Sequence, residues 1–380
     1  MEEAPLGGLS PQVFLRRHWQ KRPLLVRGAL PGFRGVIEKR ALFALAGRGD
    51  VESRLVRRVR ARDRVRRGGN GWRVEHGPLS AAAFARLRGK RDWTLLVNGV
   101  NHHRAEAERL LRRFAFIPQA RLDDVMVSYA APGGGVGPHA DSYDVFLVQG
   151  AGRRVWRLAR PRRFSEVPDA PLRQIAGFRA DEELLAEPGD ILYLPPGWGH
   201  DGVALEDCHT CSVGFRAPRG AELAAAFLDF LHERGLRDAA YRDPGLRPAA
   251  HPARISGGLL AFAERELGRI RWGHGEVAEF LGRYLSTPKP NVVFSRPRRR
   301  RARTLQGRTA LLDPKTQLLY LGARFFINGD SFSPRPAQRF MLAALADRRM
   351  ASGAALARAG LAGLICEWQQ AGLLTLAPRT

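Results

Sequence analysis

The residue types best suited to chemistry are a histidine and an aspartate two positions apart, His139 and Asp141, directly after a glycine-rich run at 133–137. In a β-strand, side chains two positions apart point to the same face, so a strand here would present both groups together, with Tyr143 beside them. Two histidines and one carboxylate make a metal site that keeps coordination positions open and suits non-haem Fe(II). The pair therefore predicts an iron site that lacks one histidine.

His200 is the candidate for the missing ligand. It follows a Gly-Asp turn at 189–190 and closes a Pro-Pro-Gly corner at 195–197. Strands that are distant in sequence lie side by side in a double-stranded β-helix, so the separation between Asp141 and His200 is no obstacle. We therefore expect His139, Asp141 and His200 to bind one Fe(II) ion.

A cation is also expected near this metal. An iron oxygenase of this kind commonly uses 2-oxoglutarate to reduce O₂, and an arginine can bind the distal carboxylate of 2-oxoglutarate through two parallel N–H groups. Arg154 lies on the strand expected after the metal strand, two residues before Trp156. Because side chains alternate along a strand, we expect Arg154 to point into the barrel and Arg153 and Arg157 to point outward.

The segments that must position these residues are rich in short strands. Residues 51–78, with Gly-Gly-Asn-Gly at 68–71, predict a β-hairpin. Residues 145–148 are expected to continue the strand of His139. Further strands are expected at 93–97, 124–129, 153–158, 191–194 and 211–215. Many short strands at this spacing are typical of a sandwich or barrel.

Beyond residue 218 the apolar residues recur at helical spacing, at 220–234, 256–271 and 275–285. After a stretch rich in proline and arginine, helices are expected again at 336–347, 352–359 and 361–371, followed by a short strand. We therefore predict an α+β protein in four segments: a double-stranded β-helix (jelly-roll, cupin) catalytic domain at 1–218, a helical domain at 219–290, a basic linker at 291–307 and a winged-helix-like domain at 308–380.

Composition limits the class of protein. The chain has 380 residues, of which 44% are hydrophobic, and such a length is typical of two or three domains. No apolar run approaches the length that crosses a membrane, and the N-terminus lacks the layout of a signal peptide. Three cysteines are too few for a disulfide framework. We therefore expect a cytoplasmic protein without a membrane segment.

The formal net charge of +25 allows two interpretations. A field of this size favours contact with polyanions such as ribosomal RNA. The arginines are scattered along the chain, however, which is typical of ordinary solvated surfaces. The densest cluster, at 296–303, is either a solvated linker or a nucleic-acid contact.

Several motifs together resemble the JmjC-type ribosomal oxygenases of the cupin superfamily. They are Gly-Gly-Gly-Val-Gly-Pro-His-Ala-Asp at 133–141, Tyr-Asp-Val-Phe at 143–146, Gly-Arg-Arg-Val-Trp at 152–156, Gly-Asp-Ile-Leu-Tyr at 189–193 and Pro-Pro-Gly-Trp-Gly-His at 195–200. The similarity covers residues 1–250, continues more weakly beyond them, and is greatest to the bacterial branch that hydroxylates an arginine of large-subunit ribosomal protein L-sixteen.

This resemblance implies a 2-oxoglutarate-dependent dioxygenase that uses Fe(II), 2-oxoglutarate and O₂ to hydroxylate the β-carbon of an arginine in a ribosomal protein. It implies a JmjC catalytic domain, a helical domain that forms a homodimer, and a winged-helix domain. His139, Asp141 and His200 would bind the iron, and Arg154 would bind 2-oxoglutarate.

The resemblance also implies a binding site for the substrate guanidinium. In the family an acidic residue and a tyrosine serve this purpose, and they match Asp124 and Tyr143. Strand alternation places Met126 on the same face as Asp124, and Ser212 lies on a neighbouring strand. We therefore expect Asp124, Met126, Tyr143 and Ser212 to line the substrate pocket.

Two positions depart from relatives, and two other functions stay open. Ala130 stands where relatives can carry a small hydroxyl residue, and Thr210 where they can carry an amide; both changes bear on how 2-oxoglutarate is held. One alternative is a hydroxylase of a histidine or another residue in a different ribosomal protein. The other is a non-catalytic protein that binds ribosomes or RNA through its basic surface.

Overall fold

An eight-stranded antiparallel sheet forms the main wall of the N-terminal part. The computed structural model describes residues 4–59, 71–236, 238–295 and 304–378. The strand order in this sheet is β1-β10-β7-β12-β5-β4-β2-β3. These strands are β1 (Leu24–Val26), β2 (Ser53–Arg58), β3 (Trp72–His76), β4 (Trp93–Val97), β5 (Leu122–Ala130), β7 (Val145–Ala151), β10 (Ile191–Leu194) and β12 (Cys208–Phe215). The expected hairpin is confirmed by the pairing of β2 with β3; its expected turn at 68–71 falls partly outside the described residues.

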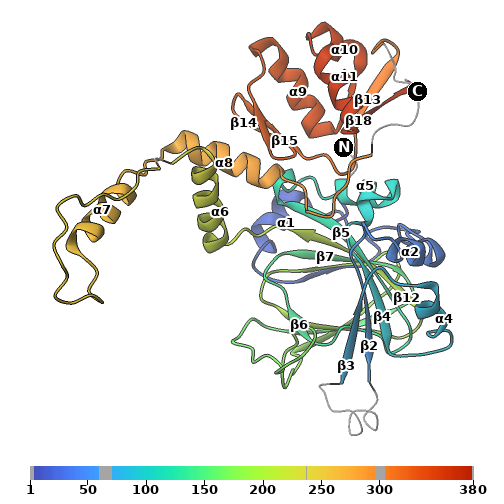
Figure 1. The fold of residues 1–380 in the computed structure, drawn as a ribbon. Helices are drawn as coiled ribbons and strands as arrows, with labels where there is room; N and C mark the ends of the chain where they lie inside the picture. The colour runs from blue at the N-terminus through green and yellow to red at the C-terminus, as the bar shows by residue number, and fades with distance from the viewer. Residues whose placement is uncertain (1–3, 60–70, 237, 296–303, 379–380) are drawn as a thin grey trace.

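One face of this sheet is covered by short helices (Figure 1). They are α1 (Pro11–Arg17), α2 (Lys39–Ala46), α4 (Ala81–Ala85) and α5 (Ala105–Arg112). Ser10 caps α1 by accepting a hydrogen bond from the amide of Val13, and Pro11 occupies the first turn, where no N–H is needed. Phe14, Leu42 and Leu110 pack with sheet residues in one apolar core. The other face of the sheet is therefore left for a second sheet.

That second sheet has four strands in the order β6-β11-β8-β9. They are β6 (His139–Ala140), β8 (Arg154–Ala159), β9 (Glu182–Ala186) and β11 (Gly199–Ala204). Leu147 and Leu192 of the large sheet pack with Trp156 and Leu158 of the small one. Figure 1 shows the two sheets facing each other as a flattened barrel, which confirms the expected double-stranded β-helix.

The expected continuous strand from His139 to residue 148 is wrong. β6 ends at Ala140, residues 141–144 bend, and β7 belongs to the opposite sheet. Asp144 holds this crossing, because its fully buried carboxylate accepts hydrogen bonds from the Tyr193 hydroxyl at 2.6 Å and from the Gln20 amide at 3.0 Å. The hydrogen bonds to this buried carboxylate stabilise the bend by more than the local strand propensity would stabilise an extended β6.

Three helices follow the barrel: α6 (Gly220–Glu233), α7 (Gly257–Leu267) and α8 (His274–Ser286). α6 and α8 pack together through Phe230, Leu231 and Phe280. α7 lies on an arm that reaches away from the rest of the molecule (Figure 1), and none of its residues is buried. The helical prediction for this part is confirmed.

The C-terminal part has the expected winged-helix fold, with its own apolar core. Its helices are α9 (Pro336–Arg348), α10 (Gly353–Arg358) and α11 (Ala362–Ala371), and its strands are β13 (Arg308–Leu312), β14 (Leu318–Leu321), β15 (Arg324–Ile327), β16 (Asp330–Phe332), β17 (Met350–Ser352) and β18 (Leu374–Pro378). Gly282 of α8 lies directly on the ring of Phe326, where a Cβ would clash. Glu279 of α8 also pairs with Arg324 at 2.7 Å, so α8 is joined tightly to the winged helix.

The winged helix also contacts the barrel. The buried Arg349, at the end of α9, lies 3.3 Å from Glu108 of α5 and donates hydrogen bonds to the carbonyls of Thr316 and Asp313. The arginine cluster at 296–303 lies outside the described residues. Within the described part of the chain, no helix is both long enough and apolar enough to cross a membrane.

Candidate active site

Three side chains that can bind a metal converge between β6 and β11. His139 and His200 are direct partners in the antiparallel pairing of these strands. Asp141 follows β6 immediately, and its Oδ2 lies 3.6 Å from Nε2 of His200. One ligand atom from each of the three residues lies within 4.8 Å of the others. The structure thus brings together the three residues that the sequence singled out.

The backbone orients both imidazoles. Nδ1 of His139 lies 2.9 Å from the carbonyl of Gly137, and Nδ1 of His200 lies 3.0 Å from the carbonyl of Trp198. A carbonyl only accepts, so each Nδ1 carries the proton and each Nε2 keeps a free lone pair. Burial, and after it the neighbouring His139, lowers the pKa of His200 to about 4. Two imidazoles and a carboxylate are the donor set that fits Fe(II).

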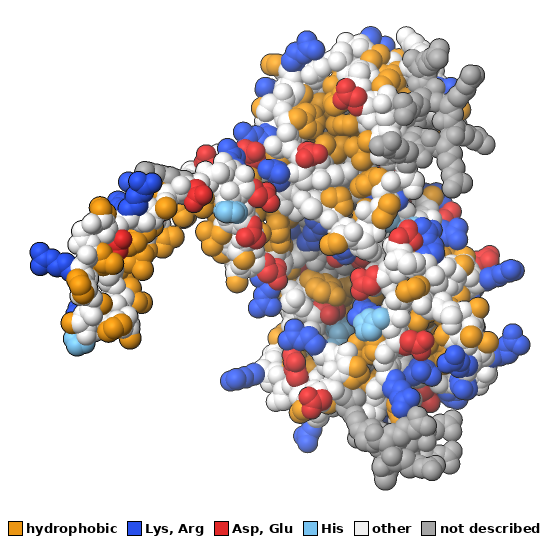
Figure 2. Space-filling model, in the orientation of Figure 1, with side chains coloured by type: hydrophobic (Ala, Val, Ile, Leu, Met, Phe, Trp, Pro, Cys, Tyr) orange, Lys and Arg blue, Asp and Glu red, His pale blue; other side chains and the backbone are white. Residues whose placement is uncertain are grey.

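A cavity of about 790 Å³ opens beside these residues, between the two sheets. Figure 2 shows a hollow on this face with histidine side chains inside it. A cavity of this volume is large enough for a small dicarboxylate and an amino-acid side chain together. The alternation of β5 builds one wall: Asp124, Met126 and Ser128 line the cavity, while Val125 and Val127 lie in the core behind it.

Arg154 of β8 also lines the cavity, and only 4% of it is exposed. Its Nε lies 3.3 Å from the sulfur of Cys208, and among the described residues its buried Nη2 has no hydrogen-bond partner. A buried guanidinium with an unpaired donor is suited to bind an anion. As strand alternation predicted, Arg153 and Arg157 point outward, where they pair with Glu206 and Glu183.

The two positions that we expected to depart from relatives, Ala130 and Thr210, differ in their relation to the cavity. Thr210 lines the cavity and donates its hydroxyl to Oε1 of Gln149 at 2.9 Å. Gln149 therefore supplies an amide beside Thr210. Ala130 packs in a small buried cluster with Ala204 and Cys208 and does not line the cavity.

The residues expected to bind a substrate lie on the same cavity. Met126 and Ser212 are direct partners on the neighbouring strands β5 and β12. Tyr143 also lines the cavity, although it lies in the bend after β6 and not on a strand as expected. Burial raises the pKa of the Tyr143 hydroxyl, and the charges of Asp141 and Asp124 raise it further.

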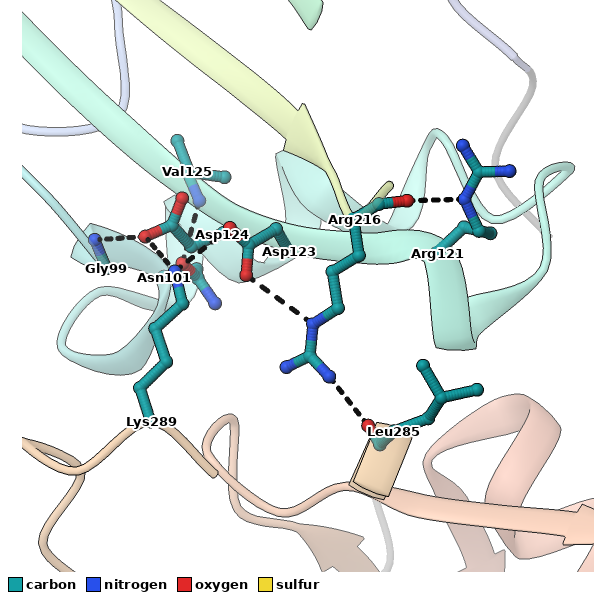
Figure 3. A network of polar contacts seen from close by, with 9 residues as sticks. All are labelled: Gly99, Asn101, Arg121, Asp123, Asp124, Val125, Arg216, Leu285 and Lys289. Atoms are coloured by element: carbon teal, nitrogen blue, oxygen red, sulfur yellow. Dashed lines mark hydrogen bonds and ion pairs between the residues drawn. The ribbon is translucent and has the colours of Figure 1, made fainter. Parts of the chain in front are cut away.

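The sequence did not indicate Lys289 as a site residue. Lys289 comes from the segment after α8, yet it lines the cavity and its Nζ lies 3.3 Å from Oδ2 of Asp124 and 3.0 Å from Oδ2 of Asp123 (Figure 3). It stands between two prolines, Pro288 and Pro290, a pattern typical of a solvated linker. Nothing in that local pattern points to a cavity more than 160 residues away in sequence, as the pairing of Lys289 with Asp124 requires.

Family models match two parts of the chain: a JmjC domain at residues 109–223 and a ROXA-like winged helix at residues 269–375. The curated relatives include the ribosomal protein uL16 3-hydroxylase of Escherichia coli, 44% identical over 64% of this chain and 62% of that protein. A probable ribosomal oxygenase of Haemophilus influenzae is 41% identical over 57% of this chain and 52% of that protein. The matched region thus spans about half to three fifths of these relatives.

Solved structures match over a longer range. The crystal structure of YcfD from Escherichia coli superposes with a TM-score of 0.81 and 32% identity, over 97% of this chain and 98% of that one. A structure of YcfD, described as a ribosomal oxygenase, in complex with cobalt and 2-oxoglutarate matches with a TM-score of 0.78 and 32% identity over the same shares. The match therefore includes the barrel, the helical segment and the winged helix.

Proposed function

This chain belongs to the JmjC-domain ribosomal oxygenases, and from that premise we propose that it is an Fe(II)- and 2-oxoglutarate-dependent dioxygenase that hydroxylates the β-carbon of an arginine in ribosomal protein uL16. One observation carries the proposal. A complete set of metal ligands, an unpaired buried arginine and an acidic wall residue line one cavity. The first two suit the iron and its co-substrate, and the third suits a cationic side chain.

His139, Asp141 and His200 would hold the iron, and Arg154 would bind the distal carboxylate of 2-oxoglutarate. When bound, Fe(II) would couple the oxidation of 2-oxoglutarate by O₂ to succinate and CO₂ with the insertion of the second oxygen atom into a C–H bond. Arg154 is suited to this role because burial strengthens its attraction for a carboxylate and its position is fixed by Cys208.

Asp124 would bind the substrate guanidinium, with Met126, Tyr143 and Ser212 around it. Asp124 is 7% exposed, and its Oδ2 already accepts a hydrogen bond from the amide of Gly99 at 3.0 Å. The flat ring of Tyr143 and the flexible thioether of Met126 suit the faces of a planar cation. Anchoring the guanidinium in this wall would leave the aliphatic part of the side chain for the metal side of the cavity.

Mass spectrometry can test the proposed function directly. The purified protein is incubated with Fe(II), ascorbate, 2-oxoglutarate and uL16 of the same organism, and uL16 is then searched for a peptide heavier by one oxygen atom. We expect the oxygen on an arginine, only with 2-oxoglutarate and not with the His139→Ala variant. Oxygen on a histidine or on another ribosomal protein would favour the alternative hydroxylase, and no oxidation of any ribosomal protein would favour a non-catalytic binding protein.

A homodimer is the assembly that best suits the arm. No residue of α7 is buried within the described chain, and Figure 2 shows hydrophobic side chains gathered on the side of the arm that faces the body. Exposed apolar surface of this extent is typical of a protein interface. A second copy whose own arm packs between this arm and the body would cover the apolar side of both arms. The large hydrophobic side chains exposed in this part are Leu228, Leu236, Leu246, Ile255, Leu259, Leu260, Leu267, Trp272 and Val277.

The proposed substrate also bears on where the enzyme acts and on what else it contacts. A ribosomal protein as substrate places the enzyme in the cytoplasm, and the scattered lysines and arginines on the face in Figure 2 would favour contact with ribosomal RNA. We divide the chain into a JmjC domain at 1–218, a helical dimerisation domain at 219–290, a basic linker at 291–307 and a winged-helix domain at 308–380.

A further inference from the structure

Lys289 competes for the carboxylate that a substrate guanidinium needs. It enters the cavity wall from the segment between α8 and the winged helix, and its Nζ is shared between Oδ2 of Asp123 and Oδ2 of Asp124. Figure 3 shows its side chain reaching across from that segment to the start of β5. A cation of the chain itself therefore occupies the position that we assign to the substrate cation.

The contact limits how Asp124 can bind anything else. Its Oδ2 already accepts from both Gly99 and Lys289, whereas among the described residues its Oδ1 accepts no hydrogen bond. A guanidinium binds a carboxylate best through both oxygens at once. With Lys289 in place, only one oxygen is available and an ammonium lies beside it, so a guanidinium would bind through one hydrogen bond against a like charge.

Lys289 can leave Asp124 without losing its counter-ion. Its Nζ lies 3.0 Å from Asp123, nearer than the 3.3 Å to Asp124. Burial lowers the pKa of Lys289, but the charges of Asp124 and Asp123 raise it by more, so the ammonium stays protonated. Pro288 and Pro290 restrict the backbone on both sides, and the flexible side chain is then the part that moves.

We propose that Lys289 determines which cation the site accepts: it holds Asp124 in the free protein and yields it to a guanidinium, while a lysine side chain gains too little to displace it. This inference rests on the proposed function. A substrate ammonium would replace one ammonium by another at the same carboxylate. A guanidinium adds a second hydrogen bond when it takes both oxygens, so only arginine gains from the exchange.

Binding measurements can test this proposal without turnover. The probes are a uL16 peptide centred on the arginine hydroxylated by the wild-type protein and the same peptide with lysine at that position. Both are titrated calorimetrically into the full chain with Co(II) and 2-oxoglutarate. For Lys289→Met we expect the Kd of the arginine peptide to fall about threefold and that of the lysine peptide about tenfold or more, as removal of one partly screened competing charge allows. The ratio between the Kd of the lysine peptide and the Kd of the arginine peptide should therefore become smaller.

Matched variants separate this role from a structural one. Lys315→Met removes a lysine that donates to the carbonyl of Val293 in the same segment, and we expect it to change neither Kd. In Asp124→Asn, a further Lys289→Met substitution should no longer strengthen binding. If Lys289→Met lowers the melting temperature, the same titrations are carried out with Lys289→Gln.

Two results would overturn the inference. Unchanged or weaker binding of the arginine peptide to a folded Lys289→Met protein would make Lys289 a structural cation. An equal gain for both peptides would remove its part in selectivity. A wild-type protein that hydroxylates no arginine would instead overturn the proposed function, and this inference with it.

Discussion

His139 and His200 face each other across the β6–β11 pairing, and their ring centroids lie 4.2 Å apart. The strand pairing sets this distance, and each ring is turned by a hydrogen bond to the carbonyl two residues before it. The lone pairs of both Nε2 atoms are thus aimed before a metal arrives. A metal ion can bind here with little rearrangement of the protein.

Replacing His139 by alanine should abolish metal binding and leave the fold intact. His139 lies at the two-residue strand β6, and the cores of the protein do not include it. Since loss of a residue that only supports a metal ligand costs about ten- to a hundredfold in affinity, loss of a ligand should cost at least a hundredfold. Calorimetric titration with Co(II) measures the affinity, and circular dichroism measures the fold. His232→Ala, at an exposed histidine on α6, is the control. If His139→Ala bound Co(II) as tightly as the wild-type protein, the metal assignment would be wrong.

Arg154→Met should raise the KM for 2-oxoglutarate about ten- to a hundredfold, because a charge-assisted hydrogen bond contributes about 1.5–3 kcal/mol. Methionine keeps most of the buried volume, so the barrel should still fold. Arg153→Met is the matched control, since Arg153 is the neighbouring residue and points outward to Glu206. Succinate formation at varied 2-oxoglutarate gives both constants, and equal effects of the two variants would reject the role of Arg154.

Asp124→Asn should weaken hydroxylation of a uL16 peptide much more than the turnover of 2-oxoglutarate without peptide. Asparagine keeps the shape of the side chain and removes the charge that a guanidinium would pair with. We expect the peptide KM to rise about tenfold or more, and the KM for 2-oxoglutarate to stay constant. Asp229→Asn, at an exposed aspartate on α6 outside the cavity, is the control. Equal losses in both activities would make Asp124 a structural residue.

Strands that are buried along their whole length could be predicted from the sequence. β4 was predicted at 93–97, and the structure has it at Trp93–Val97, because all five of its residues are buried and apolar or β-branched. β11 gave no such signal, since it contains two glycines and an aspartate. It forms because tertiary packing requires it: Gly202 lies against the ring of Trp156, where a Cβ would clash.

The candidate site could be predicted only where its residues follow local patterns. Alternation along a strand separated Arg154 from its neighbours and Asp124 from Val125. It misplaced Tyr143, because the bend at 141–144 depends on the hydrogen bonds of Asp144 with Gln20 and Tyr193, both far away in sequence. Lys289 reaches the site because the segment after α8 packs against β5, and a local sequence pattern cannot predict such packing.

The protein should lose stability as the pH falls from about 6.5 to about 4. Burial lowers the pKa of His209 to about 4, with Arg154 as a second cause, and burial also lowers the pKa of His102 to about 4, with His103 second. Below pH 6.5 the unfolded chain takes up protons that the folded chain refuses, so the free energy of unfolding falls by up to roughly 1.4 kcal/mol per pH unit for each histidine. Below pH 4 both states are protonated and this contribution is constant.

Chemical denaturation between pH 7 and pH 4 measures this dependence. His102→Gln and His209→Gln should each flatten it, whereas His232→Gln should not. A slope that both buried-site variants leave unchanged would show that other groups cause the acid sensitivity.

Charging the arm should separate the two copies of the proposed dimer. Leu260 lies on α7 and is 57% exposed, so an aspartate there disturbs little packing within the chain but would place a charge in an apolar interface. Leu205→Asp is the matched control, because Leu205 is 46% exposed and follows β11 on the barrel. Sedimentation equilibrium should give twice the monomer mass for wild type and Leu205→Asp, and a Kd at least about tenfold weaker for Leu260→Asp. Since the cavity lies within one barrel, dissociation should leave the affinity for Co(II) unchanged. A wild-type monomer, or a dimer as tight in Leu260→Asp as in wild type, would show that the arm serves another partner.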